Sequence, residues 1–348
     1  MKLKIGVVGL PLSGKSTVFS AITGSLGVAT QGKGRLEPNL ATVKVPDPRV
    51  EELSKIYSPQ KTTHAQVQYV DLAEGATAHG GSKEKELDYL IHHLNEVNAL
   101  VHVVRNFHRA GEPPTPQSDF EAFEEELILA DLMMVEKRID RLGREITKGK
   151  KGDPAELELL KQAKEVLESQ RALRGCEFIH EPQLKGYGFL SAKPCIVVLN
   201  SDESSELPKT ELPPGLPVVE VHAKLEVEIL ELPPEEAQGF REEMGIVEPA
   251  THRLIRESYS LLDLISFFTV GEDEVRAWTI RRGTTAQKAA GVIHSDIEKG
   301  FIRAEVLSYE DHLRYGTFKA AQKAGKVRLE GKDYLVQDGD IMSFRFNV

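Results

Sequence analysis

The chain has 348 residues, of which 40% are hydrophobic and 28% are charged, and its formal net charge is −10. This length favours roughly two or three domains, and the composition excludes a chain that is disordered throughout. The negative charge argues against a protein that coats nucleic acid without sequence preference.

Hydropathy and cysteine content indicate a cytoplasmic protein. No run of about eighteen apolar residues is present, and the first residues pass directly into a glycine-rich stretch that lacks the pattern of a cleavable signal. The only two cysteines, Cys176 and Cys195, have neither metal-ligand nor redox spacing. We therefore expect ordinary reduced thiols, cytoplasmic localisation and no membrane partner.

The first part of the chain has the pattern of alternating strands and helices. An apolar run at residues 2–8 predicts a strand, and residues 15–23 predict a helix that stops at Gly24. Valine-rich runs predict further buried strands at residues 67–72, 99–105, 195–200 and 217–222. This order predicts an α/β fold, a mostly parallel sheet with helices on both faces.

Two apolar seams with helical spacing lie between the predicted strands at residues 99–105 and 195–200. The first seam consists of Ile128, Leu132, Val135, Ile139, Leu142 and Ile146, and the second of Leu159, Ala163, Val166, Gln170 and Leu173. The heptad spacing, with a break at residues 148–154, predicts an antiparallel helical hairpin that projects from the sheet. Alternatively, both helices lie flat on the sheet as ordinary surface helices.

The last part of the chain contains more strands than helices. Helices are predicted at residues 286–293 and 309–319, and strands at residues 275–281, 301–308, 327–329, 333–336 and 342–346. This order fits a small mixed sheet of β-grasp type. Residues 264–348 contain 13 Lys+Arg and 12 Asp+Glu, or 13 − 12 = +1, so any nucleic-acid contact is expected here.

The segment GLPLSGKS at residues 9–16 fits the pattern G-x-x-x-x-G-K-[ST] between a strand and a helix. In such a loop, backbone N–H groups and the start of the helix hold phosphates, the lysine contacts the β- and γ-phosphates, and the serine binds Mg²⁺. The predicted nucleotide-binding residues here are Gly9, Pro11, Leu12, Ser13, Gly14, Lys15, Ser16 and Thr17. The alternative is a chance glycine turn that caps a helix.

Three further segments follow predicted strands. Asp71 ends the run at residues 67–70 and is a candidate Mg²⁺ ligand through water. Loops with the sequences NSDE and AKLE follow the two late strands, where G-domain proteins recognise the base. The first loop reads N-x-x-E in place of the guanine-selecting N-K-x-D. The predicted base-recognition residues are Asn200, Glu203, Ala223 and Lys224.

At this point the chain resembles the YchF-type, Obg-related P-loop ATPases. Besides the loops above, the resemblance rests on LEPN at residues 36–39, VPDPR at 45–49, ADL at 130–132, EVRAWTI at 274–280, AGVIH at 290–294, EKGFIRAE at 298–305 and the ending from RLEGKDY to FRFNV. It implies a G domain at residues 1–118 and 182–265, a helical hairpin at 119–181 and a TGS domain of β-grasp type at 266–348.

The resemblance also implies an activity and partners. These are slow, Mg²⁺-dependent hydrolysis of ATP, with GTP also accepted, and binding to the ribosome or ribosomal RNA, with no DNA partner expected. We therefore expect a ribosome-associated conformational switch. Family members lack the glutamine that positions water in many GTPases, and a histidine in a loop has been proposed in its place. The loop at residues 107–120 is short here, and His108 is its only histidine, whereas we expect His102 in the core.

Two departures from the family pattern affect the segments that sense the γ-phosphate. Arg35 stands where a threonine hydroxyl is expected, and Glu74 stands at the glycine of D-x-x-G, although Gly75 could restore the contact if the loop shifts by one residue. These departures keep two other hypotheses open. One is a nucleotide-binding module with little hydrolysis, and the other is an RNA- or protein-binding adaptor that uses the tail.

Overall fold

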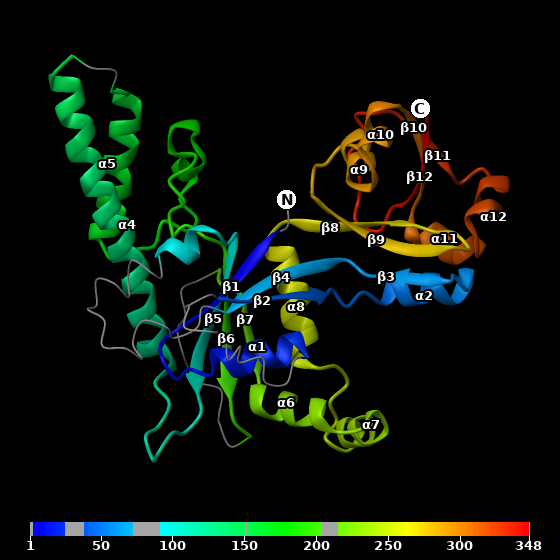
Figure 1. The fold of residues 1–348 in the computed structure, drawn as a ribbon, viewed down its shortest axis with the longest axis horizontal. Coiled ribbons are helices and arrows are strands. Elements are labelled where there is room, and N and C mark those ends of the chain that lie inside the picture. The colour runs from blue at the N-terminus through cyan, green and yellow to red at the C-terminus, as the bar shows by residue number, and fades with distance from the viewer. Residues whose placement is uncertain (1–2, 25–37, 72–90, 150–151, 204–214, 348) are drawn as a thin grey trace. The chain divides into compact units, whose positions relative to one another are not determined.

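The computed structural model of the chain describes residues 3–24, 38–71, 91–149, 152–203 and 215–347. It divides into two compact units (Figure 1), one made of Met1–Ala41 and Gln68–Leu254 and the other of Thr42–Val67 and Ile255–Val348. The domain limits predicted from the sequence stay a prediction. None of the helices in the described ranges combines the length and the apolar character that a membrane-spanning helix needs.

A six-stranded sheet, in the order β2-β4-β1-β5-β6-β7, forms the centre of the first unit. Its strands are β1 (Lys4–Val8), β2 (Asn39–Lys44), β4 (Gln66–Asp71), β5 (Ala99–Asn106), β6 (Cys195–Ser201) and β7 (Val218–Val221). From β4 to β7 every neighbouring pair is parallel. The predicted parallel sheet is confirmed, and the carboxyl ends of its strands lie at one edge.

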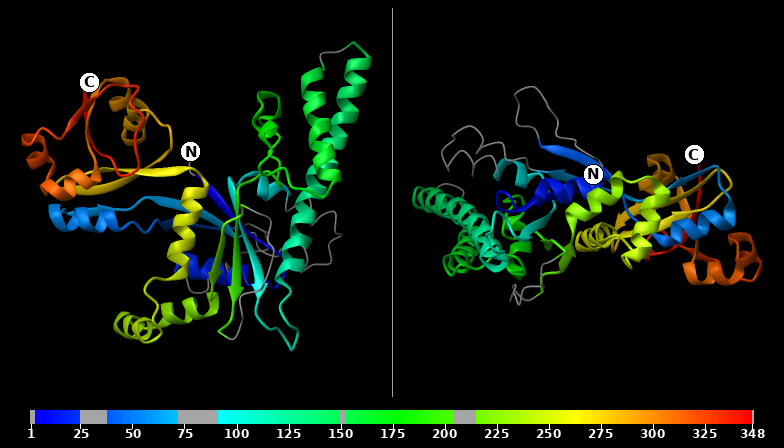
Figure 2. Two further views of the ribbon diagram at one scale, coloured as in Figure 1. Left: turned by 180° about the vertical axis from the view of Figure 1, so that it is seen from behind. Right: turned by 90° about the horizontal axis from the view of Figure 1, so that it is seen from below.

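Helices cover both faces of this sheet (Figure 2). Among the described residues of the first unit, the helices with both ends described are α1 (Lys15–Thr23), α4 (Pro116–Thr147), α5 (Pro154–Glu168), α6 (Ala223–Glu231) and α7 (Pro234–Glu243), with 3₁₀ turns η2 (Glu177–His180) and η3 (Pro182–Leu184). Helix α8 (Ala250–Leu261) leads into the second unit. Helix α1 starts and ends where predicted, and Gly24 at its end has φ of 63°, a conformation that glycine adopts without strain.

Helix α4 serves two purposes along its 32 residues. Its first half packs on the sheet through Phe123 and Leu127. Its second half extends past the sheet and packs against α5, where Val135 and Leu142 share a buried cluster with Leu160. The predicted hairpin is therefore confirmed, and the alternative that both helices lie flat is wrong for α5.

The second predicted seam is correct at Ala163 and Leu173, which are buried in the hairpin cluster, but it is displaced by one residue at two other positions. The side chains of α5 that are buried against α4 are Leu160, Ala163 and Leu167. Leu159 and Val166 are only partly buried and pack at the edge of this cluster. Two adjacent leucines made the phase ambiguous in the sequence. The helix ends at Glu168, and Gln170, with φ of 55°, lies beyond it.

A second six-stranded sheet, in the order β11-β10-β12-β8-β9-β3, forms the centre of the second unit. Its strands are β3 (Lys61–Thr63), β8 (Leu264–Thr269), β9 (Glu274–Arg281), β10 (Phe301–Leu307), β11 (Arg328–Glu330) and β12 (Ile341–Phe346). The helices are α2 (Pro48–Tyr57), α9 (Ala286–Ile293), α10 (Ser295–Lys299), α11 (Tyr309–Tyr315) and α12 (Phe318–Lys323). Ala289 of α9 packs with Phe267 and Val306 of the sheet, as expected for a sheet that covers a helix.

The structure corrects two predictions in this unit. The helix predicted at residues 309–319 is interrupted, because Gly316 has φ of 82° and divides it into α11 and α12. The strand predicted at residues 333–336 is a turn region with one isolated bridge, between Thr285 and Leu335. In addition, β3 pairs with β9 from about 200 residues earlier in the chain, a pairing without a local sequence signal.

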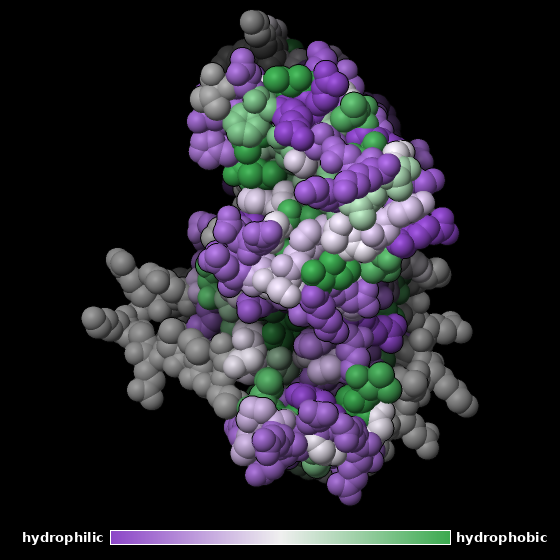
Figure 3. All heavy atoms as spheres, turned by 90° about the vertical axis from the view of Figure 1, so that its right-hand side faces the viewer, coloured by the Kyte–Doolittle hydropathy of each residue, from purple (hydrophilic) through white to green (hydrophobic). Residues whose placement is uncertain are grey.

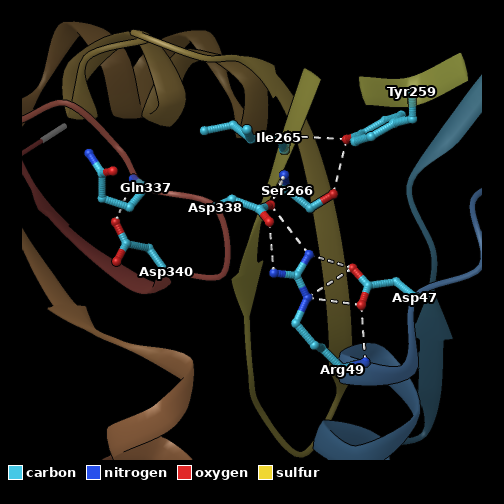
Figure 4. A network of polar contacts seen from close by, with 8 residues as sticks. All are labelled: Asp47, Arg49, Tyr259, Ile265, Ser266, Gln337, Asp338 and Asp340. Atoms are coloured by element: carbon cyan, nitrogen blue, oxygen red, sulfur yellow. Dashed lines mark hydrogen bonds and ion pairs between the residues drawn. The ribbon is translucent and has the colours of Figure 1, made fainter. Parts of the chain in front are cut away.

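An ionic network joins the N-terminal and the C-terminal segments of the second unit (Figure 4). Asp47 caps α2 by accepting the N–H of Arg49 and also accepts from its Nε at 2.9 Å. Arg49 Nη1 reaches Asp338 at 3.0 Å, and Asp338 accepts the N–H of Ser266 at 2.9 Å. The guanidinium also lies 5.1 Å from the ring centre of Phe268. The motifs at residues 45–49 and 337–340 thus meet in one network.

The face of the molecule shown in Figure 3 is mostly polar, and its apolar side chains form only small groups. Leu329 of β11 and Leu313 of α11 are examples of exposed apolar residues in the second unit. Scattered apolar residues of this kind are normal on protein surfaces. The described residues visible in this view therefore do not form a broad apolar interface.

We predict that Arg49→Ala lowers the unfolding free energy of the second unit by about 1–3 kcal/mol, because it leaves Asp47 and Asp338 without their shared partner. Urea unfolding followed by the fluorescence of Trp278, the only tryptophan, measures this. Its ring packs 6.4 Å from that of Phe267, between centroids.

The matched control for this prediction is Arg282→Ala. Arg282 pairs with Asp263, and both side chains are more than 60% exposed, so its loss should cost less than about 1 kcal/mol. Equal losses for the two variants would contradict a structural role of the Arg49 network.

Candidate functional site

The loop at residues 9–14 connects β1 to α1 at the carboxyl edge of the sheet. The backbone has positive φ at Gly9, Leu12 and Gly14, of 142°, 65° and 88°. The N–H of Ser13 donates to the carbonyl of Leu10 at 3.3 Å. The loop therefore curls over the start of α1, as expected for a cradle that presents backbone N–H groups to an anion.

Two glycines in this loop are required by close contacts. A Cβ at Gly9 would lie 2.3 Å from the backbone oxygen of Val103, and a Cβ at Gly14 would lie 2.1 Å from Nδ2 of Asn200. Neither position has space for a side chain, and both have a backbone conformation that favours glycine. The spacing of the two glycines in the sequence thus follows from the packing of the loop on β5 and β6.

Lys15 is the first residue of α1 and is 7% exposed. Its Nζ donates to the carbonyl of Leu10 at 2.8 Å. The ammonium therefore lies beside the loop, and an arriving phosphate would have to compete with this carbonyl. Ser16 and Pro11 are exposed, as is Leu12 at 51%, whereas Ser13 is buried.

The side-chain amide of Asn200 joins two loops. Its Nδ2 donates to the carbonyl of Ser13 at 3.1 Å, and its Oδ1 accepts the N–H of Ala223 at 3.3 Å. Asn200 is 5% exposed and lies near the end of β6. One amide thus fixes the loop at residues 9–14 relative to the start of α6, and the predicted phosphate and base segments meet there.

A cavity of about 640 Å³ opens beside this amide. Its walls come from α1, from the segments after β5, β6 and β7, and from α6. The lining residues are Gly14, Thr17, Phe107, His108, Asn200, Ser201, Asp202, Glu203, His222, Lys224, Leu225 and Glu228. The volume is in the range of small-molecule sites, and its position at the carboxyl ends of parallel strands is where α/β sheets bind ligands.

Of the residues predicted from the sequence, Gly14, Thr17, Asn200, Glu203 and Lys224 line this cavity. Lys224 is 88% exposed and lies 3.7 Å from Glu228, so it borders the opening. Ala223 takes part through its backbone N–H alone. The other predicted residues of the phosphate loop precede Gly14 or lie between Gly14 and Thr17 in the sequence, and they do not line the cavity.

Asp71 is the last residue of β4 and is 2% exposed. In the register of the sheet, Asp71 lies opposite Val7 of β1. Val7 is two residues before Gly9 in the sequence. A carboxylate therefore lies at the sheet edge where the phosphate loop begins. This carboxylate and the hydroxyl of Ser16 are oxygen ligands of the kind that Mg²⁺ prefers. Arg35, Glu74 and Gly75 lie outside the described residues.

The segment between β5 and α4 turns tightly at Arg109 and Glu112, which exchange backbone hydrogen bonds of 3.1 and 2.8 Å. Arg105 donates to the carbonyl of Phe107 at 3.1 Å and stabilises the start of this segment. The N–H of His108 donates to Asp202 at 3.3 Å. His108 also lines the cavity, and its role in positioning water stays a hypothesis.

His102 lies in the core, as predicted. It is 1% exposed, and its ring packs against Phe120 and Phe123 at centroid distances of 5.1 and 4.7 Å. Burial, followed by the positive charges of Arg174 and Lys15, lowers its pKa to about 3. The imidazole is therefore neutral at physiological pH and cannot act as a general acid there.

Sequence reasoning missed several cavity residues, among them Phe107, His222 and Leu225. Each comes after the end of a parallel strand or in the first turn of the next helix. Their place in the fold could have identified them as ligand neighbours, but the residue types of Phe107 and Leu225 are those of a hydrophobic core and give no signal of binding. The hydrogen bonds that hold Ser201 in the cavity wall were not predicted either. Its hydroxyl accepts from Asn106 at 2.9 Å and donates to Glu220 at 2.7 Å.

Comparisons with known proteins give one consistent result. The sequence model of the family YchF-GTPase_C, described as "Protein of unknown function (DUF933)", matches residues 264–347. The chain is 42% identical over 369 residues to the "Ribosome-binding ATPase YchF" of Bacillus subtilis (strain 168), and 40% identical over 366 residues to the protein of that name in Escherichia coli O157:H7. Both alignments cover 100% of each chain.

A solved structure gives the same result for the fold. The structure of the Schizosaccharomyces pombe YchF GTPase matches with a TM-score of 0.84 at 30% sequence identity. The match covers 99% of this chain and 98% of that one. The similarity therefore extends over both compact units.

The buried His102 generates a prediction on pH. In the unfolded chain its imidazole takes up a proton below about pH 6.5, whereas the folded chain binds that proton only near pH 3. Stability should therefore fall as the pH drops below about 6.5, by about 2 kcal/mol between pH 7 and pH 5. His102→Leu should remove this part of the pH dependence, which urea unfolding followed by circular dichroism at both pH values would show.

The control is His180→Leu, which removes an exposed histidine of the same unit. This variant should keep the pH dependence of the parent chain. The account of His102 is wrong if the two variants lose stability in parallel between pH 7 and pH 5.

Proposed function

Because the chain belongs to the YchF family, we propose that it is a Mg²⁺-dependent ATPase that also accepts GTP and associates with the ribosome. The curated relatives are named ribosome-binding ATPases, and the solved relative is named a GTPase. The observation that carries the proposal is the junction at Asn200, where one amide holds the phosphate loop beside a cavity of nucleotide size.

The proposed binding mode places the triphosphate in the loop and the base in the cavity. Residues 9–16 supply backbone N–H groups, and the start of α1 adds the positive end of the helix dipole. Lys15 would exchange its bond to the carbonyl of Leu10 for the β- and γ-phosphates, because a charge-assisted hydrogen bond is stronger than a neutral one. Thr17 follows in the first turn of α1 and lines the same cavity.

Ser16 and Asp71 would hold the metal, Ser16 through its hydroxyl and Asp71 through a bound water. When bound, Mg²⁺ neutralises the phosphate oxygens during transfer to water. The contribution of the chain is mainly to bind and orient the triphosphate and to place the ammonium of Lys15 near the developing charge.

On the base side, Asn200, Glu203, Ala223 and Lys224 are the proposed contacts. Glu203 lines the cavity at the position where guanine-selective proteins have an aspartate, and its side chain is one carbon longer. The carboxylate that would pair with the guanine N–H groups is therefore displaced. This supports a preference for ATP over GTP.

A second candidate function is a nucleotide-binding module with little hydrolysis. The observation in its favour is the pair of departures at Arg35 and Glu74. A positive side chain cannot offer the missing hydroxyl, and a carboxylate near the γ-phosphate oxygens would repel them. The two candidates share the binding site and differ in turnover alone.

Lys15→Ala should lower the rate of ATP hydrolysis at least about 100-fold, since it removes the single ammonium from the phosphate loop. Steady-state phosphate release from the full chain measures this. The control Lys161→Ala removes an exposed lysine of α5 and should leave the rate unchanged. Turnover that survives Lys15→Ala would refute the enzymatic assignment, and binding without turnover in the parent chain would favour the second candidate.

ATP should bind about 10-fold more tightly than GTP, a difference of about 1.4 kcal/mol. Calorimetric titration with non-hydrolysable analogues of both nucleotides tests this. Glu203→Asp should reduce the difference between the affinities for ATP and GTP, because it restores the shorter side chain of guanine-selective proteins. Glu231→Asp, at an exposed position of α6, should leave this difference unchanged. A clear preference of the parent chain for the GTP analogue would be incompatible with the proposed base contacts.

A further inference from the structure

The sign of the charge changes abruptly along α4 and the residues that follow it. Residues 116–136 contain 7 Asp+Glu and no Lys or Arg, giving −7. Residues 137–149 contain 5 Lys+Arg and 2 Asp+Glu, giving 5 − 2 = +3. In a chain of net charge −10, the outer half of α4 is thus a local positive segment.

Four of these cations lie on one side of the helix: Lys137, Arg141, Arg144 and Lys148, called here the basic stripe. At about 100° per residue, the four positions fall within an arc of about 60° and extend over about 16 Å of the helix axis. All four side chains are exposed, and together with Glu145 they border a hollow of about 370 Å³. Val135 and Leu142, which face α5, lie on the other side of α4.

The stripe has no evident structural purpose. Arg138, which lies outside it, is held by Glu156 of α5 at 2.8 Å and therefore stabilises the hairpin. Within the stripe, Arg141 makes an ion pair of 2.9 Å with Glu145 one turn along the same helix, a contact of little energetic weight. Among the residues that the structure describes, Lys137 and Lys148 have no ion-pair partner.

The chemistry of this surface fits a polyanion better than a protein. A protein interface usually has apolar or aromatic anchors at its centre, and the arc between residues 137 and 148 has none. Several lysine and arginine side chains in a row, with N–H donors that remain available, suit the phosphates of a nucleic acid backbone. Because phosphate contacts need no base recognition, such a surface binds by charge and shape.

We propose that the basic stripe on α4 is a contact surface for the phosphate backbone of RNA. The inference deepens the proposed function, because ribosomal RNA is the polyanion that a ribosome-associated protein meets. It also differs from the sequence-based expectation, which placed nucleic-acid contact in the last 85 residues.

The test uses two variants of the full chain that each lose four positive charges. The stripe variant combines Lys137→Gln, Arg141→Gln, Arg144→Gln and Lys148→Gln. The control variant combines Lys161→Gln, Arg171→Gln, Lys185→Gln and Arg253→Gln, which are exposed residues of the same unit. Each set removes two lysines and two arginines, so both variants have a net charge of −10 − 4 = −14, and glutamine preserves helix propensity.

Two probes are used, 70S ribosomes in co-sedimentation and a labelled RNA duplex of about 20 base pairs in titration. The stripe variant should bind both at least about 10-fold more weakly than the parent chain, and the slope of log K against log salt should decrease by about 3. The control variant should match the parent chain in both respects. ATP turnover should be the same in all three proteins.

The outcomes separate the inference from the proposed function. If the parent chain binds ribosomes and the stripe variant binds equally well, the inference is overturned and the proposed function stands. If the parent chain does not bind ribosomes, the proposed ribosome association is refuted. The titration with the RNA duplex then decides the inference by itself. Loss of ribosome binding in the stripe variant without any change in duplex affinity or salt slope would identify a protein partner and overturn the RNA assignment.

Discussion

The structure of the candidate site depends on one side-chain amide. Asn200 donates to the carbonyl of Ser13 and accepts the N–H of Ala223, so it satisfies backbone groups of two loops at once. The same amide fills the space beside Gly14, which explains why that position has no side chain. Because buried amide groups are costly to leave unpaired, the loop at residues 9–14 and the start of α6 are held together, and the cavity lies beside their junction.

The two compact units are stabilised in different ways. In the first, a parallel sheet is buried on both faces, and α4 joins the core of the sheet to that of the hairpin. In the second, residues 42–67 contribute α2 and β3 to a unit that otherwise consists of the last 94 residues, and Arg49 links them through Asp338. The family model that matches residues 264–347 therefore covers only part of a compact unit.

The sequence predicted what depends on local patterns. The buried strands, the start and the end of α1, the glycine loop and the first hairpin seam all follow from apolar periodicity and glycine placement. Contacts between distant segments left no such trace: the pairing of β3 with β9 and the bridge from Arg49 to Asp338 join residues more than 200 positions apart. The seam was assigned to Leu159 instead of Leu160 because adjacent leucines fit the same helical pattern. Phe107 and Leu225 were not predicted as cavity residues because their residue types are typical of a hydrophobic core.

The loop at residues 9–16 and the cavity beside Asn200 should hold a single nucleotide. A crystal structure of the full chain with a non-hydrolysable ATP analogue and Mg²⁺ would show whether they do. We expect the triphosphate within hydrogen-bond distance of Lys15 and of the loop N–H groups, with the adenine between Asn200 and Lys224. A base bound outside this cavity would contradict the proposed site. So would a loop at residues 9–16 without bound phosphate when the ATP analogue is present at millimolar concentration.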